Sequence, residues 1–175
     1  MGIETEPEWQ KVMDNLSPIP EDDQYYLPTR EATDAFTNFA KRRDHPIVIG
    51  SYGMLPNDQI DIAKMSNTFD EIMNEWNWES TWGWDYPMLA MSATRLGKPL
   101  AAIESLFTDT QKNTYLVNGH NYQSPRLRIY LPGNGGLLAA VAMMAAGFEG
   151  AEIENPGFPK DGTWDIKWEG LEPIL

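Results

Sequence analysis

The sequence predicts a mainly α-helical protein built from antiparallel helical hairpins. The clearest evidence is Asp58–Trp76, where apolar residues recur at three- and four-residue spacing, as they do along one face of a helix. Two shorter helices are expected at Met88–Leu96 and Leu100–Phe107, because Gly97 and Pro99 favour the end of one helix and the start of the next. Helices joined by such short loops are typical of hairpins.

Three further helices complete this prediction. Trp9–Leu16 carries apolar residues at helical spacing, and Thr29 stands where it could cap a helix over Arg30–Arg43. Gly135–Gly147 is apolar on every side, which is typical of a helix that is buried on every side. We therefore expect this last helix in the interior of the protein.

The chain divides into three predicted regions. Residues 1–28 are rich in acids and prolines and predict an extended N-terminal connector. Residues 29–150 are expected to form the helical-hairpin domain, and residues 151–175 a C-terminal tail whose short strands pack on the helices. The short strands expected in the loops and the tail are Arg126–Leu131, Thr163–Trp168 and Leu171–Leu175.

The composition excludes several classes of partner and site. A net charge of −13 argues against nucleic acid or an anionic membrane as a partner, because both repel an acidic surface. The absence of cysteine excludes disulfides, thiolate catalysis and cysteine-based metal sites. No apolar stretch approaches the roughly 18 residues of a membrane span, and the acidic N-terminus lacks the features of a signal peptide. We therefore expect a soluble protein and leave its compartment open.

The segment Trp76–Pro87, W-N-W-E-S-T-W-G-W-D-Y-P, is the strongest candidate for a functional site. It holds four of the seven tryptophans, two carboxylates and a tyrosine. Aromatic rings stack on the C–H faces of sugars, and carboxylates accept hydrogen bonds from sugar hydroxyls or transfer protons. Trp82 and Trp84 are two residues apart around a glycine, which fits a helix face poorly, so we predict that they bind substrate. The alternative is that these indoles belong to the core.

Glu79 and Asp85 are the candidate catalytic carboxylates. Glycoside hydrolysis uses two such groups, of which one donates a proton while the other activates water or attacks carbon. Burial beside the tryptophans would raise the pKa of one of them toward the acid role. The structural alternatives are that Asp85 caps the next helix and that Glu79 binds backbone N–H groups of its loop.

His120, Asn121 and Tyr122 lie in a long polar loop and offer a set of hydrogen-bonding groups for the hydroxyls of a substrate. The alternative role for His120 is to stabilise the loop. No metal site and no cofactor are expected, because the chain has only two histidines, His45 and His120, and they lack metal-ligand spacing.

The segment Pro132–Gly136, P-G-N-G-G, stands directly before the small-residue helix. Its backbone N–H groups could hold an oxygen or an anion, or its glycines could form a tight turn that lets the helix pack closely. It matches neither the P-loop, which needs a following Gly-Lys-Ser/Thr, nor the dinucleotide-binding pattern G-x-G-x-x-G.

Three stretches carry a resemblance to a known group of proteins. They are W-G-W-D-Y-P-M-L-A-M-S-A-T-R-L-G, N-T-Y-L-V-N-G-H-N-Y-Q and Y-L-P-G-N-G-G-L-L-A-A-V-A-M-M-A-A-G. Together they resemble the C-terminal part of bacterial glycoside hydrolase-like proteins of the six-hairpin, (α/α)6-toroid group, over roughly Asp44 to Gly170. W-x-W-D-Y-P is also similar to the Q-W-D-x-P-x-G-W signature of trehalases, and G-N-G-G is similar to the D-G-N-F-G-G helix start of fucosidase-type members.

The resemblance implies a partial toroid of paired helices with its site at the funnel end, where loops carrying Glu79, Asp85, His120 and Asn134 would converge. Asn134 thereby joins the residues expected to bind substrate. One departure is that Leu131 and Pro132 stand where the fucosidase-type pattern has an aspartate base. A second is that a complete toroid has six hairpins, more than this chain supplies, and that the proton donor of these relatives tends to come from an earlier helix.

The function expected from these observations is that of a carbohydrate-active protein, similar to the C-terminal portion of a glycoside hydrolase. Whether such a portion hydrolyses O-glycosyl bonds by itself stays open, as do two alternatives, a non-catalytic glycan-binding module and a helical interaction module. The expected partners are carbohydrate and either a second copy or an N-terminal companion chain that completes the toroid, because a partial toroid exposes apolar faces.

Overall fold

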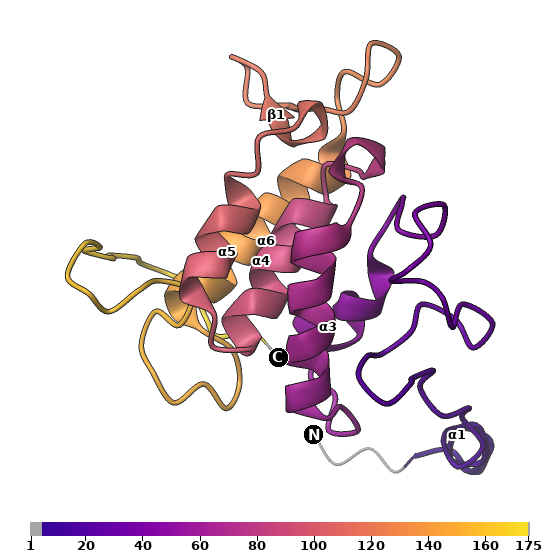
Figure 1. Ribbon diagram of the computed structural model, residues 1–175. Coiled ribbons are helices and arrows are strands. Elements are labelled where there is room, and N and C mark those ends of the chain that lie inside the picture. Colours follow the sequence, from indigo (N-terminus) through magenta and orange to yellow (C-terminus); the bar gives the residue numbers. More distant parts are fainter. Residues whose placement is uncertain (1–4, 175) are drawn as a thin grey trace.

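The computed structural model describes residues 5–174 and confirms a mainly helical fold with few strands (Figure 1). Its α-helices are α1 (Pro7–Met13), α2 (Gly50–Gly53), α3 (Ile62–Glu75), α4 (Asp85–Arg95), α5 (Pro99–Leu106) and α6 (Leu131–Ala146). Short 3-10 helices lie at Ile47–Ile49 (η1), Trp78–Ser80 (η2) and Gln111–Asn113 (η3). Strands β1 (Thr114–Tyr115) and β2 (Asn121–Tyr122) pair antiparallel, with Thr114 opposite Tyr122. Within residues 5–174, no helix has the length and apolar character needed to cross a membrane.

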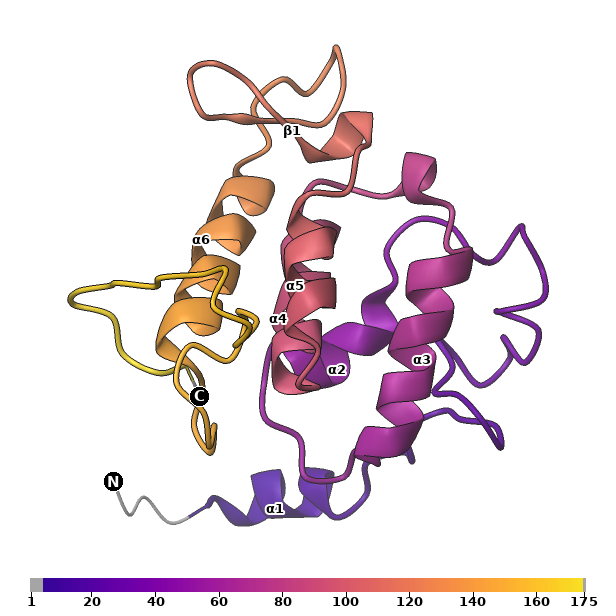
Figure 2. The ribbon, with the colours of Figure 1, turned by 60° about the vertical axis from the view of Figure 1, so that its left-hand side comes forward.

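Helix α4 forms the centre of the fold, because all of its residues are buried. It packs against α2, α5 and α6. The chain reverses at Gly97, whose φ of 68° is readily adopted by glycine, so α4 and α5 form the hairpin that the sequence predicted. Figure 2 shows α6 and α3 on opposite sides of this hairpin, and Figure 1 shows the β1–β2 hairpin at the end where α4 and α6 begin.

Helix α3 confirms the helix that the apolar periodicity of its sequence predicts. Met65, Phe69 and Ile72 are completely buried on one face, four and three residues apart. Asp61 caps the helix, because its carboxylate accepts the backbone N–H of Lys64 at 3.0 Å. The helix therefore begins four residues after the predicted start and ends one residue before the predicted end.

Helix α6 begins four residues earlier than predicted and includes the P-G-N-G-G segment, in which Gly133 and Gly136 allow close packing. A Cβ placed at Gly136 would lie 2.9 Å from Cγ of Pro87 on α4. The expectation that α6 is buried on every side is wrong, because Leu138 is 73% exposed and Val141 is 42% exposed. One face of α6 packs on α4, and the opposite face meets no other element of the described chain that buries it.

The helix expected over Arg30–Arg43 is absent, and turns take its place. Side chains compete for the backbone there. The carbonyl of Asp34 accepts the Thr37 hydroxyl, and the Asn38 side chain accepts the backbone N–H of Ala40. Asp, Asn and Thr favour such local bonds over helix, which outweighs the apolar spacing of this segment.

The three expected strands are also absent from residues 5–174. Pro125 occupies a turn closed by the N–H of Leu127 and the carbonyl of Ser124, and helix α6 already starts at Leu131, so Arg126–Leu131 forms no strand. The described tail contains one isolated parallel bridge, between Phe148 and Ile174, in place of the two strands. A toroidal arrangement of the helices is not confirmed either, and the three-region division of the chain stays a prediction.

The contact of α2 with α4 leads to a stability prediction. A Cβ placed at Gly53 would lie 1.9 Å from Oγ and 2.8 Å from Cα of Ser92, so Gly53→Ala must push two helices apart. We expect a loss of about 1–3 kcal/mol in the free energy of unfolding, measured by urea denaturation. Gly135→Ala is the control, because nothing lies within 4 Å of its Cβ position in α6. The control should gain about 0.5–1 kcal/mol, and equal effects of the two changes would contradict the packing argument.

Candidate functional site

The strongest cluster of chemical groups lies where α4 begins. The side chain of Asp85 is completely buried, and its Oδ1 and Oδ2 lie 2.9 Å and 3.2 Å from Nδ1 of His45. Oδ2 also accepts the backbone N–H of Trp82 at 2.8 Å. Burial raises the pKa of Asp85 to about 6, although the hydrogen bonds from Trp82 and His45 act in the opposite direction. Asp85 therefore titrates close to neutral pH.

A second donor reaches the same imidazole nitrogen. The indole Nε1–H of Trp84 points to Nδ1 of His45 at 3.0 Å. A ring nitrogen carries either one proton or one lone pair, so Nδ1 either donates to the Asp85 carboxylate or accepts the Trp84 N–H, but not both at once. The other imidazole nitrogen, Nε2, lies 3.6 Å from Oδ1 of Asp44.

Aromatic rings surround the imidazole. The ring centroid of His45 lies 5.7 Å from that of Trp82 and 5.2 Å from that of Trp84, and Trp82 in turn lies 5.6 Å from Tyr130. The Trp82 indole donates to Oδ1 of Asp44 at 3.0 Å. Both tryptophans are partly exposed, whereas burial and the nearby Asp85 raise the pKa of Tyr130. We call these six residues, Asp44, His45, Trp82, Trp84, Asp85 and Tyr130, the Asp85–His45 site.

The loop before α2 holds His45 in place. Asp44 adopts a φ of 63°, which is uncommon for a residue other than glycine. Its backbone N–H donates to the Ser80 hydroxyl at 2.8 Å, and its carbonyl accepts the Trp76 indole N–H at 2.9 Å. Two hydrogen bonds from the segment that follows α3 thus stabilise an unfavourable backbone conformation at Asp44. Backbone conformations of this kind are concentrated at functional sites.

Asn121 connects the polar loop to the starts of α4 and α6. It is completely buried, and its amide donates to the carbonyls of Lys112 and Thr114 at 3.1 Å and 3.3 Å. A Cβ placed at Gly83 or Gly133 would lie 1.9 Å or 2.6 Å from Oδ1 of Asn121, so only glycine fits at either position. The sequence prediction that Asn121 binds substrate is untested, and this packing favours a structural role.

Two further amides act in the same region. Gln123 accepts the N–H of Gly83 at 2.9 Å and donates to the carbonyl of Thr81 at 3.2 Å. Asn134 accepts the N–H of Asn121 at 3.0 Å and donates to the carbonyl of Gly119 at 2.7 Å. These bonds bring the polar loop, the segment before α4 and the first turn of α6 together at one end of the helices (Figure 1).

The remaining predicted residues lie outside the Asp85–His45 site. Glu79 is exposed in η2, and Tyr122 is half-buried in β2. His120 is half-buried, and its Nδ1 has no hydrogen-bond partner within the described part of the chain. Of the predicted site residues, the structure thus brings Trp82, Trp84 and Asp85 together in one site. It adds three residues that the sequence analysis did not select, His45, Asp44 and Tyr130, because no local spacing relates them to Asp85.

Among residues 5–174, no group of three or more His, Asp or Glu side chains could hold a metal ion. Comparison with known proteins gives no family. No family model matches the chain, and no curated protein or solved structure matches it. The resemblance to glycoside hydrolase-like proteins therefore stays a prediction, and the function must be argued from the geometry of the site.

The raised pKa of Asp85 makes stability depend on pH. Because the folded protein binds this proton more tightly than a model aspartate of pKa 3.8, stability due to Asp85 is highest below pH 3.8 and falls as the pH rises to about 6. Above that value the buried charge costs up to about 3 kcal/mol. Asp85→Asn keeps the shape without the charge. We expect the variant to gain stability relative to the parent between about pH 4 and about pH 8, measured by urea unfolding. A difference that is constant over this range would show that Asp85 titrates normally.

Proposed function

We propose that the chain binds carbohydrate at the Asp85–His45 site, as part of a glycoside hydrolase-like protein. The observation that carries the proposal is the contact of two partly exposed rings, Trp82 and Tyr130, beside a half-exposed imidazole and an exposed carboxylate. Aromatic rings offer flat apolar faces for the C–H faces of a pyranose, while imidazole and carboxylate groups bind its hydroxyls. Apolar surface with a few fixed polar groups is the usual composition of a small-molecule site.

Each residue has a defined part in this proposal. Trp82 and Tyr130 supply the stacking surface. Asp44 holds the Trp82 indole through Oδ1, and its side chain is 66% exposed, so the carboxylate can accept a sugar hydroxyl as well. The half-exposed imidazole of His45 offers a ring nitrogen to a sugar hydroxyl. Asp85 and Trp84 act through His45, because both contact Nδ1 and thereby fix the orientation of the ring.

The same geometry favours binding over hydrolysis by this chain alone. A glycosidase needs one carboxyl group to protonate the glycosidic oxygen and a second to activate water or attack carbon. Asp85 is completely buried, so it reaches a ligand only through His45, and Glu79 is exposed in η2, outside the Asp85–His45 site. Hydrolysis in this proposal requires a further acid, supplied by a companion chain.

The proposal predicts that replacing a tryptophan weakens sugar binding only when that tryptophan belongs to the Asp85–His45 site. Trp82→Ala should raise the Kd for soluble oligosaccharides at least about fivefold, because stacking on one ring is worth about 1 kcal/mol or more and the Asp44 carboxylate also loses its indole partner. The measurement is titration calorimetry against a panel of neutral and acidic oligosaccharides. Trp168→Ala is the matched control, since this indole is 45% exposed but lies in the C-terminal tail.

A second comparison separates binding from catalysis. Glycan binding without turnover, retained in Glu79→Gln, supports the binding function. Release of reducing sugar by the isolated chain, abolished in Glu79→Gln or Asp85→Asn, would instead assign hydrolysis to the chain itself. Equal loss of affinity in the Trp82 and Trp168 variants, or no affinity for any member of the panel, would overturn the proposed site.

A further inference from the structure

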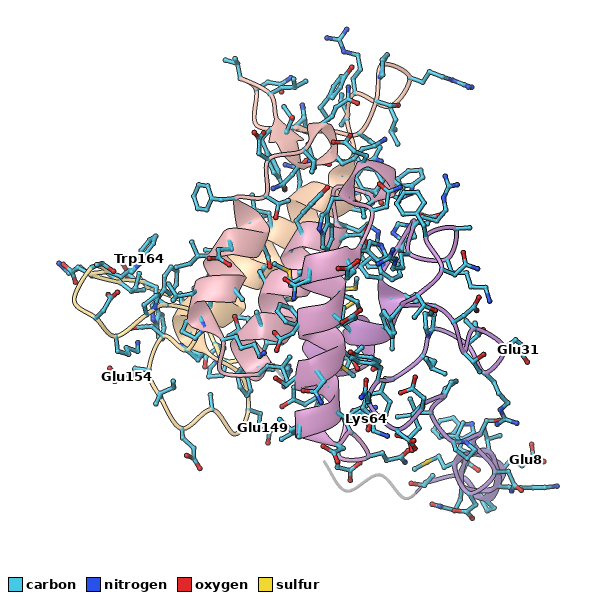
Figure 3. The ribbon with its side chains drawn as sticks, viewed as in Figure 1. Glu8, Glu31, Lys64, Glu149, Glu154 and Trp164 are labelled. Atoms are coloured by element: carbon cyan, nitrogen blue, oxygen red, sulfur yellow. The ribbon has the colours of Figure 1, made fainter. Side chains whose placement is uncertain are left out.

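The region from η3 to α6 is the basic part of an acidic protein. Its lysine and arginine residues are Lys112, Arg126 and Arg128, and residues 110–148 contain no aspartate or glutamate, so all 26 acidic residues lie elsewhere in the chain. Figure 1 places the loop that follows β2 at the top, where α6 begins, whereas the glutamates that Figure 3 labels lie at the sides and the lower end of the molecule. A net charge of −13 therefore coexists with a basic region beside the Asp85–His45 site.

The two arginines of this region have no acidic partner. Arg126 and Arg128 are exposed, and neither forms an ion pair within residues 5–174, whereas five other lysine and arginine side chains of that range do. Lys112 instead donates to the carbonyl of Gln123 at 3.2 Å, within the same region. A guanidinium group offers five N–H donors in a planar fork that matches the oxygens of an anion, so Arg126 and Arg128 can bind an acidic ligand.

Hydrogen bonds hold the arginines next to Trp82. Leu127 stands between them, and its carbonyl accepts the backbone N–H of Gln123 at 3.1 Å. The side chain of Gln123 in turn accepts the N–H of Gly83 at 2.9 Å and donates to the carbonyl of Thr81 at 3.2 Å. Gly83 and Thr81 are the two neighbours of Trp82, so the turn that carries the arginines is fixed to the backbone on both sides of this indole.

The other end of the same segment is fixed to the aromatic surface. The N–H of Tyr130 donates to the carbonyl of Asn121 at 2.9 Å, and its ring centroid lies 5.6 Å from that of Trp82. Arg128 is two residues before Tyr130, so their Cα atoms are at most about 7 Å apart. Arg128 therefore lies between two anchored residues at the edge of the stacking surface, which lowers the entropic cost of ordering it around a ligand.

We propose that the sugar bound at the Asp85–His45 site is acidic, and that Arg126 and Arg128 bind its carboxylate or sulfate ester. The inference rests on the proposed function, because the pyranose ring is the group that stacks on Trp82 and Tyr130. Both kinds of anion offer several acceptor oxygens, and charge-assisted hydrogen bonds from arginine to such oxygens are about twice as strong as neutral ones. The two arginines thus select among sugars, while the aromatic rings bind the part that all pyranoses share.

The charges around the site define the orientation of such a ligand. The exposed carboxylate of Asp44 repels an anionic group, so the hydroxyls of the sugar face Asp44 and His45 while its acidic group faces the arginines. The rest of the chain is strongly acidic, and salt limits the attraction of the arginines to about 8 Å at physiological ionic strength. The contact is therefore local, as expected for one acidic sugar unit rather than for a long polyanion.

The test compares each acidic oligosaccharide with its uncharged counterpart by titration calorimetry on the full chain. The probes are oligomers of galacturonate and mannuronate with their methyl esters, and sulfated galactan oligomers with their desulfated forms. The parent should bind the acidic member of a pair at least about tenfold more tightly, because a hydrogen bond to a charged group is worth about 1.5 kcal/mol or more. Added salt should weaken only this acidic preference. The pair that shows the preference identifies the acidic group as carboxylate or sulfate.

A double variant and a matched control assign the preference to the arginines. Arg126→Gln combined with Arg128→Gln should reduce the affinity for the acidic member to that of its uncharged counterpart, which itself should change less than about twofold. Lys11→Gln combined with Arg30→Gln removes the same two charges from exposed residues near the N-terminus and should change neither affinity. All four side chains are exposed, so both variants should fold, and circular dichroism checks this.

The outcomes separate this inference from the function on which it rests. Equal affinities within every pair, with binding that still depends on Trp82, would overturn the acidic-sugar inference and leave the proposed function in place. An equal loss of acidic affinity in the control variant would assign the preference to net charge. Acidic binding that persists in Trp82→Ala would assign it to a surface unrelated to the sugar site, and either of these two results also overturns the inference. No affinity for any member of any pair would overturn the proposed function itself.

Discussion

Helix α4 is buried along its whole length, so each polar group on it needs a partner inside the protein. Ser92 donates to the carbonyl of Met88, Thr94 donates to that of Ala90, and the Tyr86 hydroxyl is hydrogen-bonded to Thr81 and Thr110. Asp85 differs from these hydroxyl groups because it is an acid, buried at the start of the helix, and its partner is a histidine. The burial that stabilises the fold is therefore also the cause of the unusual pKa in the site.

Close contacts of glycine set the position of the surrounding loops. Asn121 fits between Gly83 and Gly133 only because neither residue carries a Cβ, and Gly136 allows α6 to approach Pro87 of α4. These contacts fix the segment before α4, the polar loop and the first turn of α6 relative to one another. The same arrangement fixes the position of Tyr130, because its N–H donates to the carbonyl of Asn121 while its ring packs on Trp82. The aromatic surface of the proposed sugar site thus depends on backbone packing some residues away.

Local patterns in the sequence determined α3, α4 and α5 to within a few residues, because apolar spacing and glycine or proline boundaries act over one or two helical turns. The same reasoning failed over Arg30–Arg43, where Asp34 and Asn38 bind the backbone instead. For the site, sequence reasoning predicted Trp82, Trp84 and Asp85, which are close together in the chain. The tertiary structure alone decided that His45 meets Asp85 across 40 residues and that Tyr130 completes the aromatic surface. Such contacts leave no periodic signal in the sequence, and the burial that raises the pKa of Asp85 exists only after the helices have packed.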